Sequence, residues 1–175
     1  MKVAIYPGSF DPVTLGHLDV LHRAADMFDK VVIAVVANPQ KAPLFSIEER
    51  VEMIEESVNH DSRIEVDSFE GLSVDYARRI GATAIVKGLR AVSDFESELQ
   101  QALFNRKLAP EITTVFLMTS FANVYLSSSL IKEVARLGGD ISFAVPAPAL
   151  KLLARLTPAG GASAALGGEN SPAQG

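Results

Sequence analysis

The first turn of the chain limits the possible folds more than any other feature. Val3–Tyr6 is an apolar run with β-branched residues, which predicts a buried strand. Apolar residues then recur at helical spacing, at Leu18, Leu21, Ala25 and Phe28. Residues 6–17 connect the two and contain two glycines and two prolines. A buried strand that leads through such a loop into a helix is typical of the start of an α/β domain.

His17 falls in the first turn of this helix. Free N–H groups and the positive end of the helix dipole gather there, which favours a phosphate. Gly8 and Gly16 let a ligand approach the backbone closely. His17 is therefore a candidate phosphate ligand, and a histidine that only packs at the helix start is an equally compatible interpretation.

Length and composition narrow the class of protein. The 175 residues are 48% hydrophobic, which suits a single domain with a sizeable core. The net charge of −5 argues against a general nucleic-acid-binding surface, and the absence of cysteine excludes disulfides. No apolar run has the length of a membrane span, and the first residues lack the pattern of a signal peptide. We therefore expect a cytoplasmic protein with neither nucleic-acid nor membrane partners.

Four more strands are predicted along the chain. Residues 31–37 are apolar on both faces, as in the middle of a parallel sheet. Ile64 and Val66 mark a third strand, residues 84–86 a fourth and residues 113–118 a fifth.

Helices are predicted between these strands. Ser46 and Glu49 form a capping box that opens a helix, and its buried stripe would be Ile47, Val51, Ile54 and Val58. Ser73–Ile80 is a short helix that ends at Gly81. Further helices would begin at a second capping box of Ser93 and Glu96, at the serines 127–129, and near Leu150. Residues 1–157 then form one domain, and the Ala-, Gly-, Ser- and Pro-rich residues 158–175 are predicted to be a disordered tail.

This alternation predicts a Rossmann-like, doubly wound parallel sheet of five strands in the order 3-2-1-4-5. Ligands of such sheets bind beyond the carboxyl ends of the strands. The loops at that edge carry the polar candidates, which are His17, Lys41, Lys87, Arg90 and Ser127–Ser129. The prediction is one site built from four loops.

The residue types in these loops indicate an anionic ligand. Single loop cations are usually solvated, but Lys41, Lys87 and Arg90 on one rim favour a polyanion. Ser127–Ser129 offer hydroxyls and N–H groups at a helix start, where one serine alone would suffice as a cap. Glu98 is compatible either with a surface charge or with a contact to a ribose or base.

Other nucleotide and metal motifs are missing. The chain has neither a G-x-G-x-x-G nor a Walker A sequence. His17 and His22 are five residues apart and do not share a helix face, so no zinc site is predicted.

Long motifs give the chain a specific resemblance. Thr14-Leu15-Gly16-His17 is similar to the T/H-x-G-H signature of the α/β nucleotidylyltransferases. Together with residues 6–13, Lys87-Gly88-Leu89-Arg90, Asp94-Phe95-Glu96 and residues 127–136, it resembles the bacterial phosphopantetheine adenylyltransferase family over residues 1–156. That family transfers AMP from ATP to 4′-phosphopantetheine, giving dephospho-coenzyme A and pyrophosphate.

The resemblance implies roles for individual residues. His17 would stabilise the transition state. Ser9, Lys41, Ser73 and Lys87 would bind phosphopantetheine. ATP would be bound by Ser9, Phe10, His17, Gly88, Leu89, Arg90, Glu98, Asn123, Val124, Tyr125, Leu126, Ser127, Ser128 and Ser129. Mg²⁺ would accompany the triphosphate, the protein would be a homohexamer, and coenzyme A would be a feedback ligand.

The chain departs from the family pattern at a few positions. Residues 123–126 read Asn-Val-Tyr-Leu, where the family usually has an aromatic residue followed by Ser-Phe-Ile or Ser-Phe-Val. Ser97 stands where Tyr is frequent, and Gln101 where an apolar residue is frequent. We expect these changes to alter side-chain contacts of the pockets and to leave backbone contacts in place.

Two alternative functions are considered. One is a nucleotidylyltransferase with another acceptor, such as nicotinate mononucleotide or glycerol 3-phosphate. The other is a nucleotide sensor without catalysis, against which the presence of His17 argues. An aminoacyl-tRNA synthetase is disfavoured because the chain has no room for a tRNA-binding domain.

Overall fold

A computed structural model describes residues 1–37 and 42–156 of the chain. Lys41 and the predicted tail, residues 158–175, lie outside the described residues. The elements in chain order are β1 Val3–Gly8, α1 Leu15–Ala25, β2 Lys30–Ala37, α2 Ile47–Ser57, β3 Ile64–Glu70, α3 Ser73–Arg79, β4 Ala84–Leu89, α4 Val92–Leu108, β5 Thr113–Met118, α5 Ser128–Arg136, α6 Ala147–Leu153 and a 3₁₀ turn at Ala154–Leu156. No helix among these described elements is long and apolar enough to cross a membrane.

The sheet confirms the predicted topology. Its five strands lie in the order β3-β2-β1-β4-β5, and every neighbouring pair is parallel. The order reverses at β1, whose neighbours are β2 and β4. Loops that leave β1 and β4 therefore diverge at one point on the sheet edge, which is where a doubly wound sheet binds its ligands.

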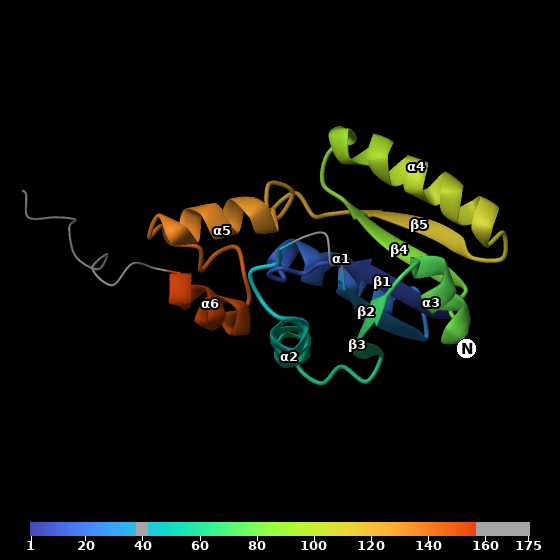
Figure 1. Ribbon diagram of the computed structural model, residues 1–175, viewed down its shortest axis with the longest axis horizontal. Helices are drawn as coiled ribbons and strands as arrows, with labels where there is room; N and C mark the ends of the chain where they lie inside the picture. Colours follow the sequence, from blue (N-terminus) through green and yellow to red (C-terminus); the bar gives the residue numbers. More distant parts are fainter. Residues whose placement is uncertain (38–41, 157–175) are drawn as a thin grey trace, which may run out of the picture.

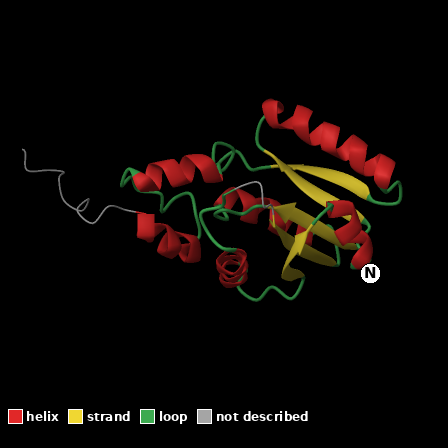
Figure 2. Ribbon diagram, viewed as in Figure 1, coloured by secondary structure: helices red, strands yellow, loops and turns green. Residues whose placement is uncertain are grey.

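Helices cover both faces of the sheet, as Figures 1 and 2 show. One core contains the apolar side chains between the sheet and α1, α2, α5 and α6, and a smaller core lies under α3 and the end of α4. Helices α5 and α6 extend beyond the sheet on the side where β1 leads into α1 (Figure 1). The serines at the start of α5 thus face the loop that follows β1.

Two predictions about α2 have different outcomes. The Ser46–Glu49 capping box is present, since Ser46 Oγ accepts from the Glu49 N–H and the Glu49 carboxylate accepts from the Ser46 N–H. The buried residues of the helix, however, are Arg50, Met53 and Ile54. Of the predicted stripe, Ile54 and Val58 are buried, and Ile47 and Val51 are partly buried and pack against the core. Arg50 and Met53 are buried residues that the prediction lacked.

The predicted capping box of Ser93 and Glu96 is wrong. Helix α4 begins at Val92, its N-cap is Ala91, and no side chain caps it. The first-turn carboxylate of Asp94 instead accepts hydrogen bonds from the Arg90 backbone and guanidinium. Asp94 therefore ties the start of α4 to the end of β4 but does not cap the helix.

Asp11 joins three separate segments of the chain. Its carboxylate accepts from the N–H groups of Leu44 and Phe45 at 3.0–3.1 Å and from Lys132 Nζ at 2.6 Å. Burial alone would raise the pKa of Asp11, but these amides and the Lys132 ammonium outweigh it and hold the pKa below its usual value. Asp11 fixes the segment after β2 and helix α5 against the first loop.

Replacing Asp11 by Ala should destabilise the protein by about 2–4 kcal/mol, because a half-buried ammonium and two amides lose their acceptor together. Urea unfolding at neutral pH measures this. The difference should shrink as the pH falls through the depressed pKa of Asp11, since the protonated carboxyl no longer attracts Lys132. Asp140→Ala is the control, because among the described residues the Asp140 carboxylate accepts from the exposed turn at Ser142 alone, and it should leave the midpoint unchanged. An Asp11→Ala protein as stable as this control would contradict the role assigned to the carboxylate.

Candidate active site

Two cavities meet at His17 on the carboxyl edge of the sheet. The first has a volume of about 310 Å³ and lies between the first loop, the end of β4, the start of α4 and the start of α5. The second has a volume of about 550 Å³ and lies between the first loop, α2 and α5. Both cavities are lined by Phe10, His17, Ser128 and Ser129.

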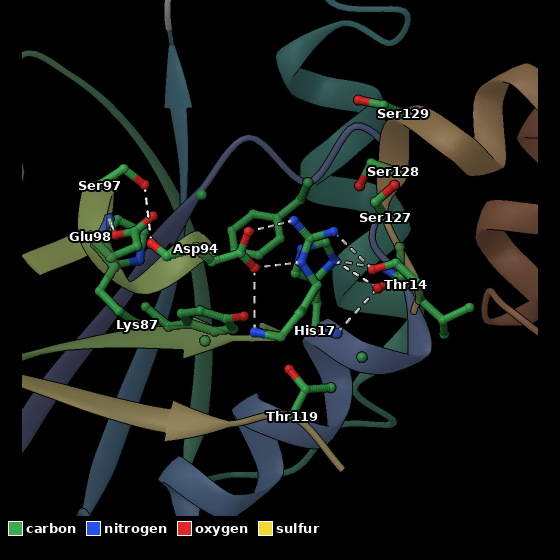
Figure 3. A pocket seen from close by; sticks show the side chains of 18 residues that line it. Thr14, His17, Lys87, Asp94, Ser97, Glu98, Thr119, Ser127, Ser128 and Ser129 are labelled. Carbon is green, nitrogen blue, oxygen red and sulfur yellow. Dashed lines mark hydrogen bonds and ion pairs between the residues drawn. The ribbon is translucent and has the colours of Figure 1, made fainter. Parts of the chain in front are cut away.

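The structure brings together most of the predicted site residues. Figure 3 shows the first cavity, with Lys87 and Glu98 on one side, the serines of α5 on the other and His17 between them. Its lining includes Gly88, Arg90 and Leu126. Ser9 lines the second cavity. The predicted residues Ser73, Leu89, Asn123, Val124 and Tyr125 line neither cavity.

The His17 ring is fixed by the helix cap. Thr14 Oγ1 accepts from the His17 N–H at 3.2 Å, and the Thr14 N–H donates to His17 Nδ1 at 3.1 Å. Because a backbone N–H can only donate, Nδ1 is the acceptor and the ring proton of the neutral imidazole is on Nε2. The capping box thus sets the tautomer and leaves Nε2–H as the free donor.

The surroundings of His17 favour the neutral ring. Burial, assisted by the positive charge of Arg90, lowers the pKa of His17 from 6.5 to about 4. The Phe10 ring packs edge-on against the imidazole, with centroids 5.2 Å apart. At neutral pH His17 is therefore a hydrogen-bond donor without charge.

The backbone of Phe10 adopts a conformation that is unusual for a residue other than glycine. Its φ of 46° is in the left-handed region, and its ring packs edge-on against Tyr6 as well as against His17. A Cβ on Gly8 would come within 2.7 Å of Phe10 Cζ, so any other residue there would displace the Phe10 ring. The first loop thereby builds an aromatic support beneath the histidine.

The two predicted cations of the first cavity both have carboxylate partners. Lys87 Nζ lies 3.0 Å from Glu98 Oε2, but its geometry gives a hydrogen bond to Gln101 Oε1 at 2.9 Å instead. Arg90 bonds Asp94 and donates to the Leu126 carbonyl at 3.1 Å, which ties the end of β4 to the loop before α5. Glu98 Oε2 is buried and accepts no hydrogen bond within the described part of the chain.

The three serines have three different environments. Ser127 Oγ caps α5 by accepting from the Leu130 N–H, and Ser128 Oγ donates to the Pro12 carbonyl at 2.8 Å. Ser129 is exposed at the border of both cavities. One serine therefore caps the helix, one ties it to the first loop, and one lines the cavities. The first N–H groups of the helix lie beside the cavities.

Sequence reasoning missed the polar residues of the second cavity, which are Asp11, Arg50 and Lys132. Asp11 belongs to the quoted first-loop motif, and Lys132 follows Ser129 by one helical turn, so both could have been proposed. Arg50 gave no such signal, because it is surrounded in sequence by the glutamates of α2.

The donor set does not form a metal centre of its own. Within residues 1–37 and 42–156, no group of three or more His, Asp or Glu side chains is placed to hold a metal ion. A hard cation that arrives with phosphate oxygens and water needs no such cage.

The depressed pKa of His17 can be measured directly. An NMR titration of the histidine ring protons, with His17 assigned by its loss in His17→Gln, should place its midpoint at about 4. Burial and Arg90 both oppose protonation, so Arg90→Gln should raise this midpoint. A His17 midpoint at the ordinary value of 6.5 would show that the ring is cationic in mildly acid solution, contrary to the geometry.

Comparison with solved structures supports the fold. A protein from Vibrio parahaemolyticus described as a "putative nicotinate-nucleotide adenylyltransferase" superposes with a TM-score of 0.68 over 89% of this chain and 93% of that one. The sequence identity is 17%, so this likeness concerns the architecture alone.

Comparison with sequences is more specific. The cytidylyltransferase-like family profile matches residues 5–134. Phosphopantetheine adenylyltransferase of Alkaliphilus metalliredigens is 57% identical over 89% of this chain and 99% of its own length. The enzyme of the same name from Caldanaerobacter subterraneus subsp. tengcongensis is 58% identical over 83% of this chain and 91% of its own length. With its T-x-G-H loop at the meeting point of two cavities, the chain belongs to the phosphopantetheine adenylyltransferase family.

Proposed function

We propose that the protein transfers AMP from ATP to 4′-phosphopantetheine and releases dephospho-coenzyme A and pyrophosphate. The observation that carries the proposal is the 57% identity to a phosphopantetheine adenylyltransferase over nearly the whole length of that relative. The two cavities on either side of His17 suit a reaction with two phosphorylated substrates.

The chemistry needs positioning more than it needs a base. The second pKa of a phosphate monoester is about 6, so at neutral pH the acceptor is already a nucleophile. One of its oxygens forms a bond to the α-phosphorus of ATP. The bond from that phosphorus to the bridging oxygen breaks, and pyrophosphate leaves with the electron pair. The protein holds the two phosphates in line and stabilises the charge that develops.

His17 suits the role of transition-state donor. Its Nε2–H is left free by the bond from Thr14 to Nδ1, and the ring borders both cavities. Oxygens on the α-phosphate gain charge as the acceptor attacks, so the bond from Nε2–H strengthens in the transition state.

Other residues would divide between the two substrates. Ser9, Phe10, Gly88–Arg90, Glu98 and residues 123–129 are assigned to ATP, and Ser9, Lys41, Ser73 and Lys87 to the acceptor. In the free protein Lys87 faces Glu98 and Gln101, so an acceptor phosphate would compete with these partners for its ammonium. Mg²⁺ would be held by the triphosphate and would neutralise its charge.

Assembly and regulation are further parts of the proposal. Helix α4 exposes Leu99, Leu103, Phe104 and Leu108 on its outer side, which is an apolar surface of the kind that homo-oligomers bury. We infer a homohexamer on the resemblance together with this surface. Coenzyme A contains the acceptor's pantetheine part, so it could occupy the acceptor's cavity as a feedback ligand. A cytoplasmic location remains a prediction from the sequence.

The acceptor can be tested by removing its phosphate. Pyrophosphate release from ATP should be fast with 4′-phosphopantetheine and far slower with pantetheine, since pantetheine lacks the nucleophilic phosphate and leaves Lys87 without an anion. Nicotinate mononucleotide and glycerol 3-phosphate serve as competing acceptors in the same assay. Faster turnover of either would replace the proposed acceptor, and no turnover of any would favour a sensor.

Kinetics separate the roles of His17 and Arg90. His17→Ala should lower kcat by about 10²–10³ and leave the ATP dissociation constant within about threefold of wild type, because one transition-state donor is lost. Arg90→Ala should raise the KM for ATP, since a cation also acts in the ground state.

His22→Ala is the matched control, because His22 is exposed on the same helix and lines neither cavity. It should behave as wild type. If His17→Ala weakens ATP binding and keeps its kcat, His17 is an ordinary nucleotide ligand.

A further inference from the structure

Gln101 holds a lysine of the first cavity without lining that cavity itself. Its side chain comes from α4, and its Oε1 accepts from Lys87 Nζ at 2.9 Å. Lys87 lines the first cavity, whereas Gln101 lines neither of the two. Any effect of Gln101 on a ligand in the cavity must therefore pass through Lys87.

Glu98 and Gln101 compete for the same ammonium. They are three residues apart in α4 and so lie on one face of the helix. Glu98 Oε2 is 3.0 Å from Lys87 Nζ, about as close as the oxygen of Gln101, and yet its orientation gives no hydrogen bond. Lys87 thus directs a proton to the neutral amide rather than to the carboxylate.

This choice of partner leaves an open acceptor in the first cavity. Glu98 Oε2 is buried and accepts no hydrogen bond within the described part of the chain. A buried carboxylate oxygen without a donor is costly, so a donor from a ligand is expected to complete it. The hydroxyl groups of a ribose are donors of this kind.

The alternative arrangement would close this part of the cavity. An ammonium that is bonded to a carboxylate gains an attraction that a neutral amide does not offer. If Lys87 turned fully to Glu98, a ligand phosphate would have to break that bond, and a ribose hydroxyl would find Glu98 Oε2 occupied. The amide of Gln101 opposes this closure because it holds the ammonium from a second direction.

We propose that Gln101 is a positioning residue, which keeps Lys87 and Glu98 from closing into a hydrogen-bonded ion pair, so that each stays available to a substrate. The inference rests on the proposed adenylyl transfer, in which Lys87 is assigned to the acceptor and Glu98 to ATP. The family pattern frequently has an apolar residue at this position, and an apolar side chain could not accept from Lys87. The arrangement therefore belongs to chains that carry a polar acceptor here.

The test replaces Gln101 by Met, which has a similar length and only a weak acceptor. We expect Gln101→Met to raise the ATP dissociation constant and the KM for 4′-phosphopantetheine by about three- to tenfold each, because Lys87 then turns to Glu98 and both groups are engaged. Isothermal titration of the full-length protein with ATP alone measures the first, and pyrophosphate release measures the second. The kcat should stay within about twofold of wild type, since saturating substrates displace the pair.

Gln100→Met is the matched control. Gln100 is exposed on the same helix and lines neither cavity, so both constants should equal those of wild type.

Gln101→Glu separates the two substrates. The new carboxylate still accepts from Lys87, so ATP affinity should stay near that of wild type. The acceptor KM should rise, because the ammonium then has a charged partner that a phosphate must replace.

A double-mutant cycle tests the dependence on Glu98. Glu98 is the carboxylate that the described residues place within 4.0 Å of Lys87 Nζ. In Glu98→Gln this competitor is gone, so the addition of Gln101→Met should change the acceptor KM by less than about twofold.

Unchanged constants in Gln101→Met, an equal change in Gln100→Met, or an undiminished effect in the Glu98→Gln background would each overturn the inference. A fall in the acceptor KM of Gln101→Met would do so as well, because Gln101 would then only compete for the ammonium. If Gln101→Met does not fold, Gln101→Glu decides, and an acceptor KM equal to wild type then overturns the inference. Failure of the adenylyl transfer itself looks different: ATP still binds more weakly to Gln101→Met, but the wild type releases no pyrophosphate with the phosphorylated acceptor.

Discussion

The buried carboxylate of Asp11 is the contact on which the rest of the site depends. It accepts from two amides of the segment after β2 and from Lys132 of α5, so one side chain joins the first loop to both walls of the second cavity. Ser128 adds a second tie between α5 and that loop through the Pro12 carbonyl. Separate loops of an α/β sheet become a rigid site because hydrogen bonds of this kind cross between them.

The fold and the T-x-G-H loop could be predicted from sequence because both are local signals. Strand and helix periodicities predicted the alternation of elements, for which a doubly wound sheet in the observed order is typical, and Thr14 and His17 share one helix turn. The capping box of Ser93 and Glu96 failed because the helix begins at Val92, after Ala91, so Ser93 lies inside its first turn. Arg50 was missed because its glutamate-rich surroundings imitate a solvated face and only tertiary packing buries it.

The cations of the two cavities differ in whether a carboxylate is paired with them. Cations in the first cavity are paired with carboxylates, so a ligand phosphate must replace an existing partner. Arg50 in the second cavity has no such partner within the described residues. An anion that enters the first cavity therefore competes with carboxylates, whereas one that enters the second meets an arginine without a carboxylate partner among the described residues.

A neutral histidine at the boundary fits this arrangement. An imidazolium would attract the triphosphate and the acceptor phosphate in the ground state, and uniform binding of that kind does not raise kcat. Burial and Arg90 keep the pKa of His17 far below neutrality, while the Thr14 amide directs the remaining proton to Nε2. The donor then gains most when charge accumulates on the α-phosphate. Burial thus keeps the ring neutral, and the same cap that starts α1 sets the tautomer and so the direction in which its proton points.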